Sequence, residues 1–217
     1  MGIGGGFIIL GVLSVLLPIT TLVPVLAAIL ASIDLTRAIV FRAHLYKPIF
    51  YPFSIGSFFG VVTGTALFIS LPEKVIGTGL VVLILMTLLF PLGKRFNSLK
   101  QPFIWIGIVH SFLSTIFGYG GLFQSAILRT KLSNLQLTAT LATSFLLLEL
   151  LKISFYVIHG FNYSPYISII ITSACGAIPA SLLGRKFAGK IGQKFYRTSQ
   201  KVIIGIIVIS ILIKVWG

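Results

Sequence analysis

Acidic residues are nearly absent from this sequence, which has 3 Asp and Glu among 217 residues, and cysteine occurs once. No two of the acids are close together, so the sequence offers no paired general acid and base. The single Cys175 excludes an internal disulfide and a cysteine-rich metal site. Charged residues make up 9% of the chain, against about 25% in soluble domains, which excludes a soluble globular fold.

Motifs for metals, nucleotides and nucleophilic catalysis are also missing. His44, His110 and His159 show no metal-ligand spacing with one another or with Cys175. The phosphate-loop pattern and the His-Glu-x2-His pattern do not occur, and no nucleophile with a base and an orienting group can be identified. We therefore expect no enzyme, no cofactor and no metal.

Apolar residues dominate instead, at 57% of the chain, with a mean hydropathy of +1.09. They form long continuous runs, which are typical of membrane helices rather than of the alternating strands of a barrel. The runs are Gly6–Leu17, Ile19–Ile33, Ile49–Leu71, Val75–Leu92, Phe103–Leu128, Leu135–Ile158, Tyr166–Gly184 and Val202–Val215. The sequence thus predicts an all-α polytopic membrane protein, with the lipid bilayer as its surroundings.

Two of these runs are abnormal and resemble each other. Gly6–Leu17 reaches about 18 Å as a helix, too short to cross about 30 Å of hydrocarbon. Glycines at 118, 120 and 121 interrupt the middle of Phe103–Leu128. The segment from Gly2 to Phe7 aligns with that from Gly118 to Phe123 at an offset of 116 residues, which indicates two homologous halves. Matching discontinuous segments in two halves point to the binding site of a transporter.

The distribution of basic residues predicts how the halves are oriented. If 103–128 is a re-entrant hairpin, the loops 34–48, 93–102, 129–134 and 185–201 share one face and carry 14 of the 17 Lys and Arg. The positive-inside rule makes that face cytoplasmic, with the cations against anionic lipid rather than nucleic acid. Each half then has a glycine-broken re-entrant or half-helix segment and three transmembrane helices, so the two are inverted repeats. The divisions are 1–92 for the first half, 93–102 for a basic cytoplasmic linker and 103–217 for the second half; the first half is expected to lack about fifteen residues at its start, compared with the second.

The glycine breaks are the candidate substrate site. A helix that starts after such a break directs free backbone N–H groups and its positive dipole end at the break, and such ends bind anions. The alternative is that the glycines only allow helices to cross closely, which is the interpretation we give to the stripe of Gly56, Gly60 and Gly64. The candidate substrate-binding residues are Gly4, Gly5, Gly6, Gly118, Tyr119, Gly120, Gly121 and Gln124.

Three ionisable residues inside the apolar runs are candidates for a coupling site or a polar path. Glu149 and Lys152 have i,i+3 spacing and can pair on one helix face, and His110 is in the first arm of the hairpin. The alternatives are a pair that only stabilises the bundle, a Lys152 that extends to the membrane surface, and a histidine that only packs. Asp34 and Glu73 are expected in loops.

The glycine segments at 2–6 and 118–121, together with the stripe of Gly56, Gly60 and Gly64 before Leu71-Pro72, resemble the sulfite exporter TauE/SafE family (TSUP permeases). The resemblance covers nearly the whole chain and implies a non-enzymatic permease of about eight membrane segments that moves a small anion such as sulfite or a sulfonate. A proton or another ion could be coupled to transport. The alternatives are another organic anion on the same architecture, or a non-transporting subunit of a membrane assembly.

Overall fold

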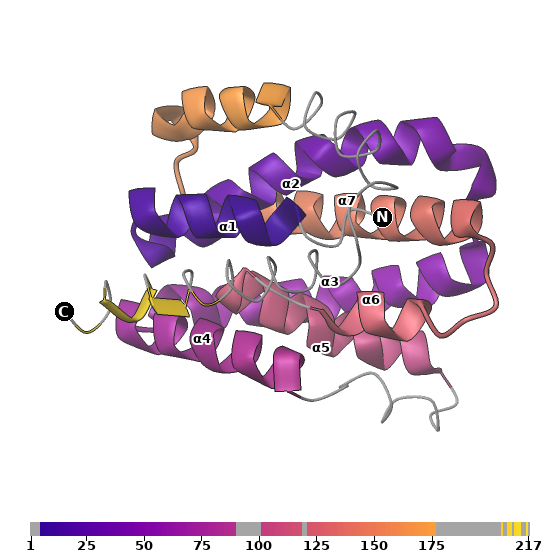
Figure 1. Cartoon of the computed structure of the whole chain (residues 1–217), viewed down its shortest axis with the longest axis horizontal. Helices are drawn as coiled ribbons and strands as arrows, with labels where there is room; N and C mark the ends of the chain where they lie inside the picture. The colour runs from indigo at the N-terminus through magenta and orange to yellow at the C-terminus, as the bar shows by residue number, and fades with distance from the viewer. Residues whose placement is uncertain are drawn as a thin grey trace.

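The computed structural model describes residues 5–89, 101–118 and 121–176, with residues 205, 208, 209, 211–213 and 216 near the C-terminus. Side chains are described from Ile9 in the first helix and as far as Met86 in the fourth. The elements are α1 (Gly5–Leu16), α2 (Ile19–Phe41), η1 (Arg42–His44), α3 (Lys47–Ser70), α4 (Glu73–Leu89), α5 (Pro102–Phe117), α6 (Leu122–Ile127), α7 (Asn134–Ile158) and η3 (Ser164–Tyr166), which continues as an apolar helix to Gly176. These parts of the chain form a bundle of helices (Figure 1).

Three helical segments are long and apolar enough to cross a membrane: Ile19–His44, Lys47–Ser70 and Asn134–Ile158. At a rise of about 1.5 Å per residue, each exceeds the roughly 30 Å of a hydrocarbon core. Large apolar side chains such as Ile39, Phe59 and Ile158 are exposed on the outside of the bundle. Such exposure is costly in water but not against lipid tails, so the prediction of an all-helical, strongly apolar fold is confirmed for the described residues.

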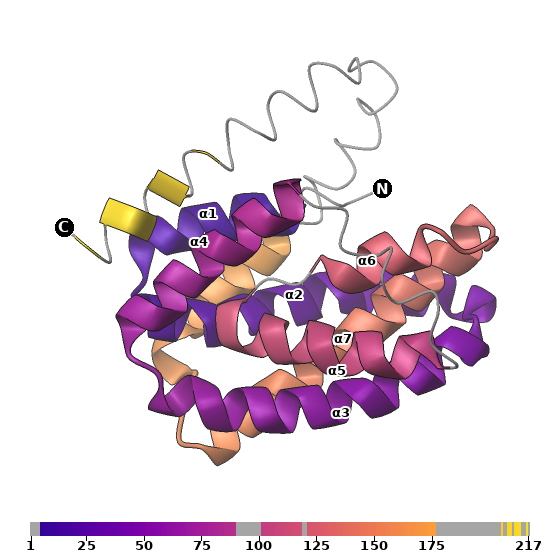
Figure 2. The same cartoon turned by 90° about the horizontal axis from the view of Figure 1, so that it is seen from below.

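The chain reverses direction between α5 and α6. Phe123 at the start of α6 contacts the rings of both Phe103 and His110 in α5, with ring centroids 6.3 and 6.2 Å apart. Phe103 lies at the far end of α5 from Gly118, so Phe123 can reach it only if α6 folds back along α5. The views in Figures 1 and 2 agree on this fold-back. The two arms have 16 and 6 residues, and neither is long enough to span a bilayer.

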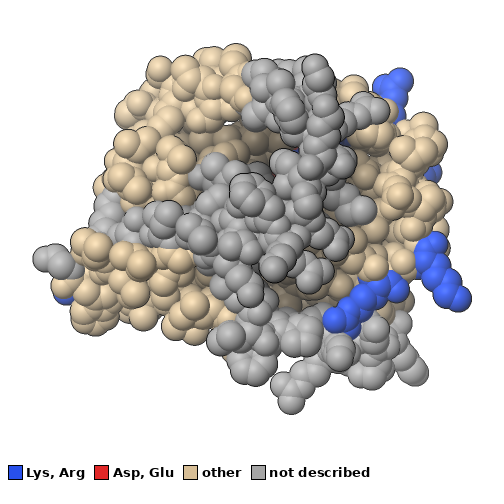
Figure 3. Space-filling view, in the orientation of Figure 1, with Lys and Arg blue, Asp and Glu red and all other residues tan. Residues whose placement is uncertain are grey.

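The fold-back places the starts of α5 and α7 at the same end of the bundle (Figures 1 and 2). The turn after α2, around Arg42–His44, is at this end too, whereas the α1–α2, α3–α4 and α7–η3 turns lie at the opposite end. Most of the basic side chains visible in Figure 3 gather toward the first end. The described basic residues in the segments at that end are Arg37, Arg42, Lys47, Arg129 and Lys131.

Glycine explains how closely α3 and α5 pack. A Cβ at Gly56 would overlap the carbonyl oxygen of Ile104, and one at Gly60 would overlap that of Ile108. Gly107 of α5 makes the reciprocal approach to α3, where a Cβ would lie 2.5 Å from the carbonyl oxygen of Phe53. The backbones of α3 and α5 therefore touch without intervening side chains. This contact supports the interpretation of the glycine stripe as a helix-packing surface.

Two expectations from the sequence are wrong. Residues 34–48 were expected to form a loop, but α2 continues to Phe41 and α3 begins at Lys47, so Asp34 lies inside a helix and is 4% exposed. Glu73 is not in a loop either, since it is the first residue of α4. The charges suggest loops, yet each carboxylate has a polar partner within the folded chain: Arg37 for Asp34, and the N–H of Ile19 for Glu73.

Candidate functional site

Glu149 and Lys152 form an ion pair inside the bundle, as their spacing on α7 predicts. The Nζ atom of Lys152 lies 2.8 Å from Oε2 of Glu149, and the two residues are 0% and 4% exposed. The alternative in which Lys152 extends to the membrane surface is therefore wrong. A charge buried among apolar helices is costly unless it is paired, and here each ion compensates the other.

Lys152 also reaches across to α5. Its Nζ atom lies 3.4 Å from the hydroxyl oxygen of Ser114, whose backbone carbonyl accepts a hydrogen bond of 2.9 Å from the N–H of Gly118. The ammonium group is therefore one helical turn from the point where the chain reverses. The sequence pattern does not show this proximity, because Ser114 and Lys152 are 38 residues apart.

The turn between α5 and α6 depends on a glycine conformation. Gly118 ends α5 with φ of 69° and ψ of 2°, a left-handed conformation that side chains disfavour. Gly121 follows as the N-cap residue of α6. Tyr119 and Gly120 lie outside the described residues. Of the candidate residues nearby, Gln124 is partly buried on α6.

His110 contacts the start of α6 directly. Its Nδ1 atom accepts a hydrogen bond of 3.4 Å from the N–H of Phe123, one of the first amides of α6. Nδ1 is thus the acceptor, which places the ring proton on Nε2. The ring is buried and stacks on Phe145 of α7 at a centroid distance of 5.5 Å. This histidine therefore positions α6 against α5 and α7.

The corresponding glycines of the first half are only partly described. Gly5 and Gly6 form the first turn of α1, and Gly4 lies outside the described residues. Among the described elements, α1 packs mainly against α2. The structure therefore brings Gly118, Gly121, His110 and the Glu149–Lys152 pair into one region, but it does not bring Gly5 and Gly6 into a described contact with it.

The structure contains a second ion pair that the sequence analysis does not predict. Oδ1 of Asp34 and Nη2 of Arg37 lie 2.6 Å apart on α2, again at i,i+3 spacing. Asp34 is within electrostatic range of Glu149 on the neighbouring α7. The spacing alone could have identified this pair, had the segment been assigned to a helix. Among the described residues, no group of three or more His, Cys, Asp or Glu could hold a metal ion.

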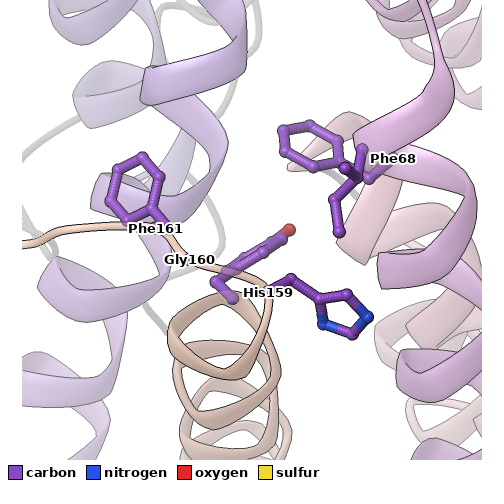
Figure 4. A pocket seen from close by; sticks show the side chains of 6 residues that line it. Phe68, His159, Gly160 and Phe161 are labelled. Carbon is purple, nitrogen blue, oxygen red and sulfur yellow. The ribbon is translucent and has the colours of Figure 1, made fainter.

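A shallow recess of about 250 Å³ opens at the end of the bundle that holds the α7–η3 turn. In Figure 4 its labelled residues are Phe68 from α3 and, after α7, His159, Gly160 and Phe161. Tyr156 also lines it and donates a hydrogen bond of 2.5 Å to the carbonyl of Thr115. Tyr156 is one turn along α7 from Lys152, so the wall of the recess lies about one helical turn from the ion pair.

Comparison with known proteins identifies the family. No curated protein and no solved structure matches the chain significantly. The family model for the sulfite exporter TauE/SafE matches residues 1–215 of 217. This match confirms the resemblance found in the glycine segments, and the members of this family are permeases rather than enzymes. The chain therefore belongs to the sulfite exporter TauE/SafE family of membrane transporters.

Proposed function

We propose that this protein is a multi-pass permease of the cell (inner) membrane that carries a small sulfur-containing oxyanion, such as sulfite or a sulfonate, through a site at the glycine breaks. The observation that carries the proposal is a fully buried cation, Lys152, one helical turn from the chain reversal at Gly118. An intramembrane ionisable residue beside broken helices is characteristic of substrate pathways.

Backbone amides and Lys152 have complementary roles in this site. At the break, N–H groups of Gly120, Gly121 and α6 would donate to the anion oxygens, and no glycine side chain would stand between backbone and anion. Lys152 adds a full positive charge from the adjacent helix, which a short row of amides lacks. Gln124 extends the set of donors on α6, and His110 holds the start of that helix in place.

Inverted repeats form part of the proposal and are supported by the helix boundaries. Shifted by the 116-residue offset, α2 (Ile19–Phe41) falls on 135–157, which matches α7 (Asn134–Ile158). Shifted in the same way, the start of α3 at Lys47 falls on 163, next to Ser164, where the following helix begins. The two ion pairs, Asp34–Arg37 and Glu149–Lys152, are 115 residues apart, within one residue of the same offset. Inverted symmetry would bring Gly4, Gly5 and Gly6 to the opposite side of the site.

Flux into proteoliposomes tests this function. Purified protein should transport at least one of sulfite, sulfoacetate and thiosulfate faster than empty liposomes. Gly120→Val and Gly5→Val should abolish that flux, because a branched side chain would fill the space of the anion. Gly176→Val is the matched control, since a Cβ there meets no atom of the described residues within 4 Å and the residue is outside the proposed site.

Each result bears on a different part of the proposal. Normal flux in Gly120→Val would move the site away from the break, and the polar path near Lys152 would then be the better candidate. Absence of flux for all three anions in the unmodified protein would contradict the substrate class.

A further inference from the structure

The Glu149–Lys152 pair has few other partners inside the bundle. A lysine ammonium group has three N–H donors, and its polar contacts among the described residues are Glu149 and the 3.4 Å contact with Ser114. Oε2 of Glu149 is buried, and in the described chain no hydrogen-bond donor other than its ion-pair partner Lys152 reaches it. Among the described residues, Lys152 is therefore the partner that holds the carboxylate, so another anion that reaches the ammonium group can compete with it directly.

Charge neutrality restricts what can happen at this pair. Two carboxylates, Asp34 and Glu149, and two cations, Arg37 and Lys152, belong to the facing helices α2 and α7, so the group has no net charge. An oxyanion that enters this region adds a negative charge, which is expensive in a low-dielectric interior. Uptake of one proton by a nearby group reduces that charge.

The groups that face Glu149 differ in their capacity to take this proton. Asp34 keeps its partner Arg37 when an anion arrives. His110 on α5 uses Nδ1 to accept from the N–H of Phe123, so a proton there would break that hydrogen bond. Tyr156 on α7 and Tyr163 after α7 already donate their hydroxyl protons, to the carbonyls of Thr115 and Pro24. Glu149 is the one member of this set whose partner the incoming anion removes.

We infer that the transported oxyanion replaces the carboxylate of Glu149 as the ionic partner of Lys152, and that Glu149 takes up one proton as it is released. No covalent bond to the anion forms. The carboxylate becomes a neutral carboxylic acid with a proton from the solution, while the ammonium group stays charged and exchanges one anionic partner for another. The protein would then move one proton with each anion. This inference rests on the proposed function and adds the coupling step to it.

A binding measurement separates this step from transport. Thiosulfate is the probe, because it does not itself take up protons near neutral pH. In weakly buffered detergent solution, a pH indicator should report about one proton taken up per bound anion, and calorimetry gives the amount bound. Glu149→Gln should bind thiosulfate at least as tightly and take up none. Glu73→Gln is the matched control, because this carboxylate at the start of α4 lies outside the four-charge group, and it should retain the uptake seen with the unmodified protein.

Variants of Lys152 test the other half of the exchange. Lys152→Gln combined with Glu149→Gln keeps the interior neutral, so the protein should fold, but it should bind thiosulfate more than about tenfold more weakly than Glu149→Gln alone. Lys152→Arg in the same Glu149→Gln background should bind thiosulfate more tightly than the Lys152→Gln double variant, since arginine restores the positive charge. Equal affinity of the double variant and Glu149→Gln would overturn the role of Lys152, and full proton uptake in Glu149→Gln would overturn the role of the carboxylate.

Proteoliposome flux distinguishes the coupling from the proposed function. In the unmodified protein, a pH gradient should drive accumulation of thiosulfate, whereas Glu149→Gln should carry thiosulfate only down its own gradient. Transport by the unmodified protein that ignores the pH gradient would overturn the coupling and leave the permease intact. No binding and no flux with sulfite, sulfoacetate or thiosulfate would overturn both.

Discussion

The carboxylate of Glu73 accepts a hydrogen bond of 2.7 Å from the backbone N–H of Ile19, which joins the first residue of α4 to the first residue of α2. The residue before α2 is Pro18, which makes no side-chain cap of its own. Glu73 thus supplies from another helix the acceptor that a local N-cap residue would otherwise provide. Its negative charge also lies at the positive end of the α2 dipole.

Glu73→Ala is therefore expected to destabilise the protein by about 1 kcal/mol, because an N–H of α2 loses its acceptor and the helix dipole loses a compensating charge. Glu73→Gln should lose less, since the amide oxygen can still accept. Thermal unfolding of the detergent-solubilised protein measures both. An unfolding midpoint for Glu73→Ala equal to that of the parent protein would show that the contact does not cap α2.

Gly60→Ala is expected to lower stability by roughly 1–3 kcal/mol, the usual cost of an overpacked site, because its methyl group would meet the backbone of Ile108 in α5. Gly176→Ala serves as the control, because within the described part of the chain a Cβ there has open space around it. At that position alanine should be neutral or slightly stabilising, by up to about 1 kcal/mol, since it favours a helix over glycine. The same thermal unfolding assay compares the two. Equal midpoints would contradict the close α3–α5 contact.

Gly118→Ala is expected to cost about 1–2 kcal/mol of stability, because an L-residue with a Cβ disfavours the left-handed backbone at φ of 69°. Gly118→Asn should cost less, as asparagine tolerates this conformation better. Flux of sulfite or thiosulfate should fall in the same order, since the turn shapes the proposed site. Faster transport by the alanine variant than by the asparagine variant would argue against this role for the turn.

Labelling of single cysteines tests the orientation of the bundle. Cys175 is exposed and is first replaced, in Cys175→Ala. His44→Cys and Thr130→Cys lie at the end with most of the described basic residues, so an impermeant reagent should reach them only from the cytoplasmic side. Asn162→Cys lies at the other end and should react from outside. Labelling of Thr130→Cys from outside, with His44→Cys reached only from the cytoplasmic side, would refute the fold-back of α6 as a re-entrant segment.

Local sequence patterns predict a helix well where the apolar run is continuous and polar residues or breakers mark both of its ends. The run Leu135–Ile158 becomes α7 at Asn134–Ile158, and the pairing of Glu149 with Lys152 follows from helical spacing alone. The same spacing rule also holds for Asp34 and Arg37, but the sequence pattern places residues 34–48 in a loop and therefore does not predict this pair. Charged residues continue a helix when they neutralise each other on one face.

Contacts between distant parts of the chain were outside the reach of the sequence. Glu73 and Ile19 are 54 residues apart, and Lys152 and Ser114 are 38 residues apart. Neither pair has a local signal, because the partner of Glu73 is a backbone N–H and the partner of Lys152 is a common serine. The family could still be identified, since glycine segments and their spacing survive as a pattern along the chain.

The glycine contact between α3 and α5 also constrains the mechanics of a transport cycle. Helices that touch through their backbones have no layer of adaptable side chains between them. Sliding or tilting α3 against α5 would therefore break the close contact between Gly60 and the carbonyl of Ile108. The two helices therefore move as one rigid body. Any rocking motion that exposes a site first to one side of the membrane and then to the other must occur at other interfaces. The contact between α7 and α2, the two helices that carry the ion pairs, is one such interface.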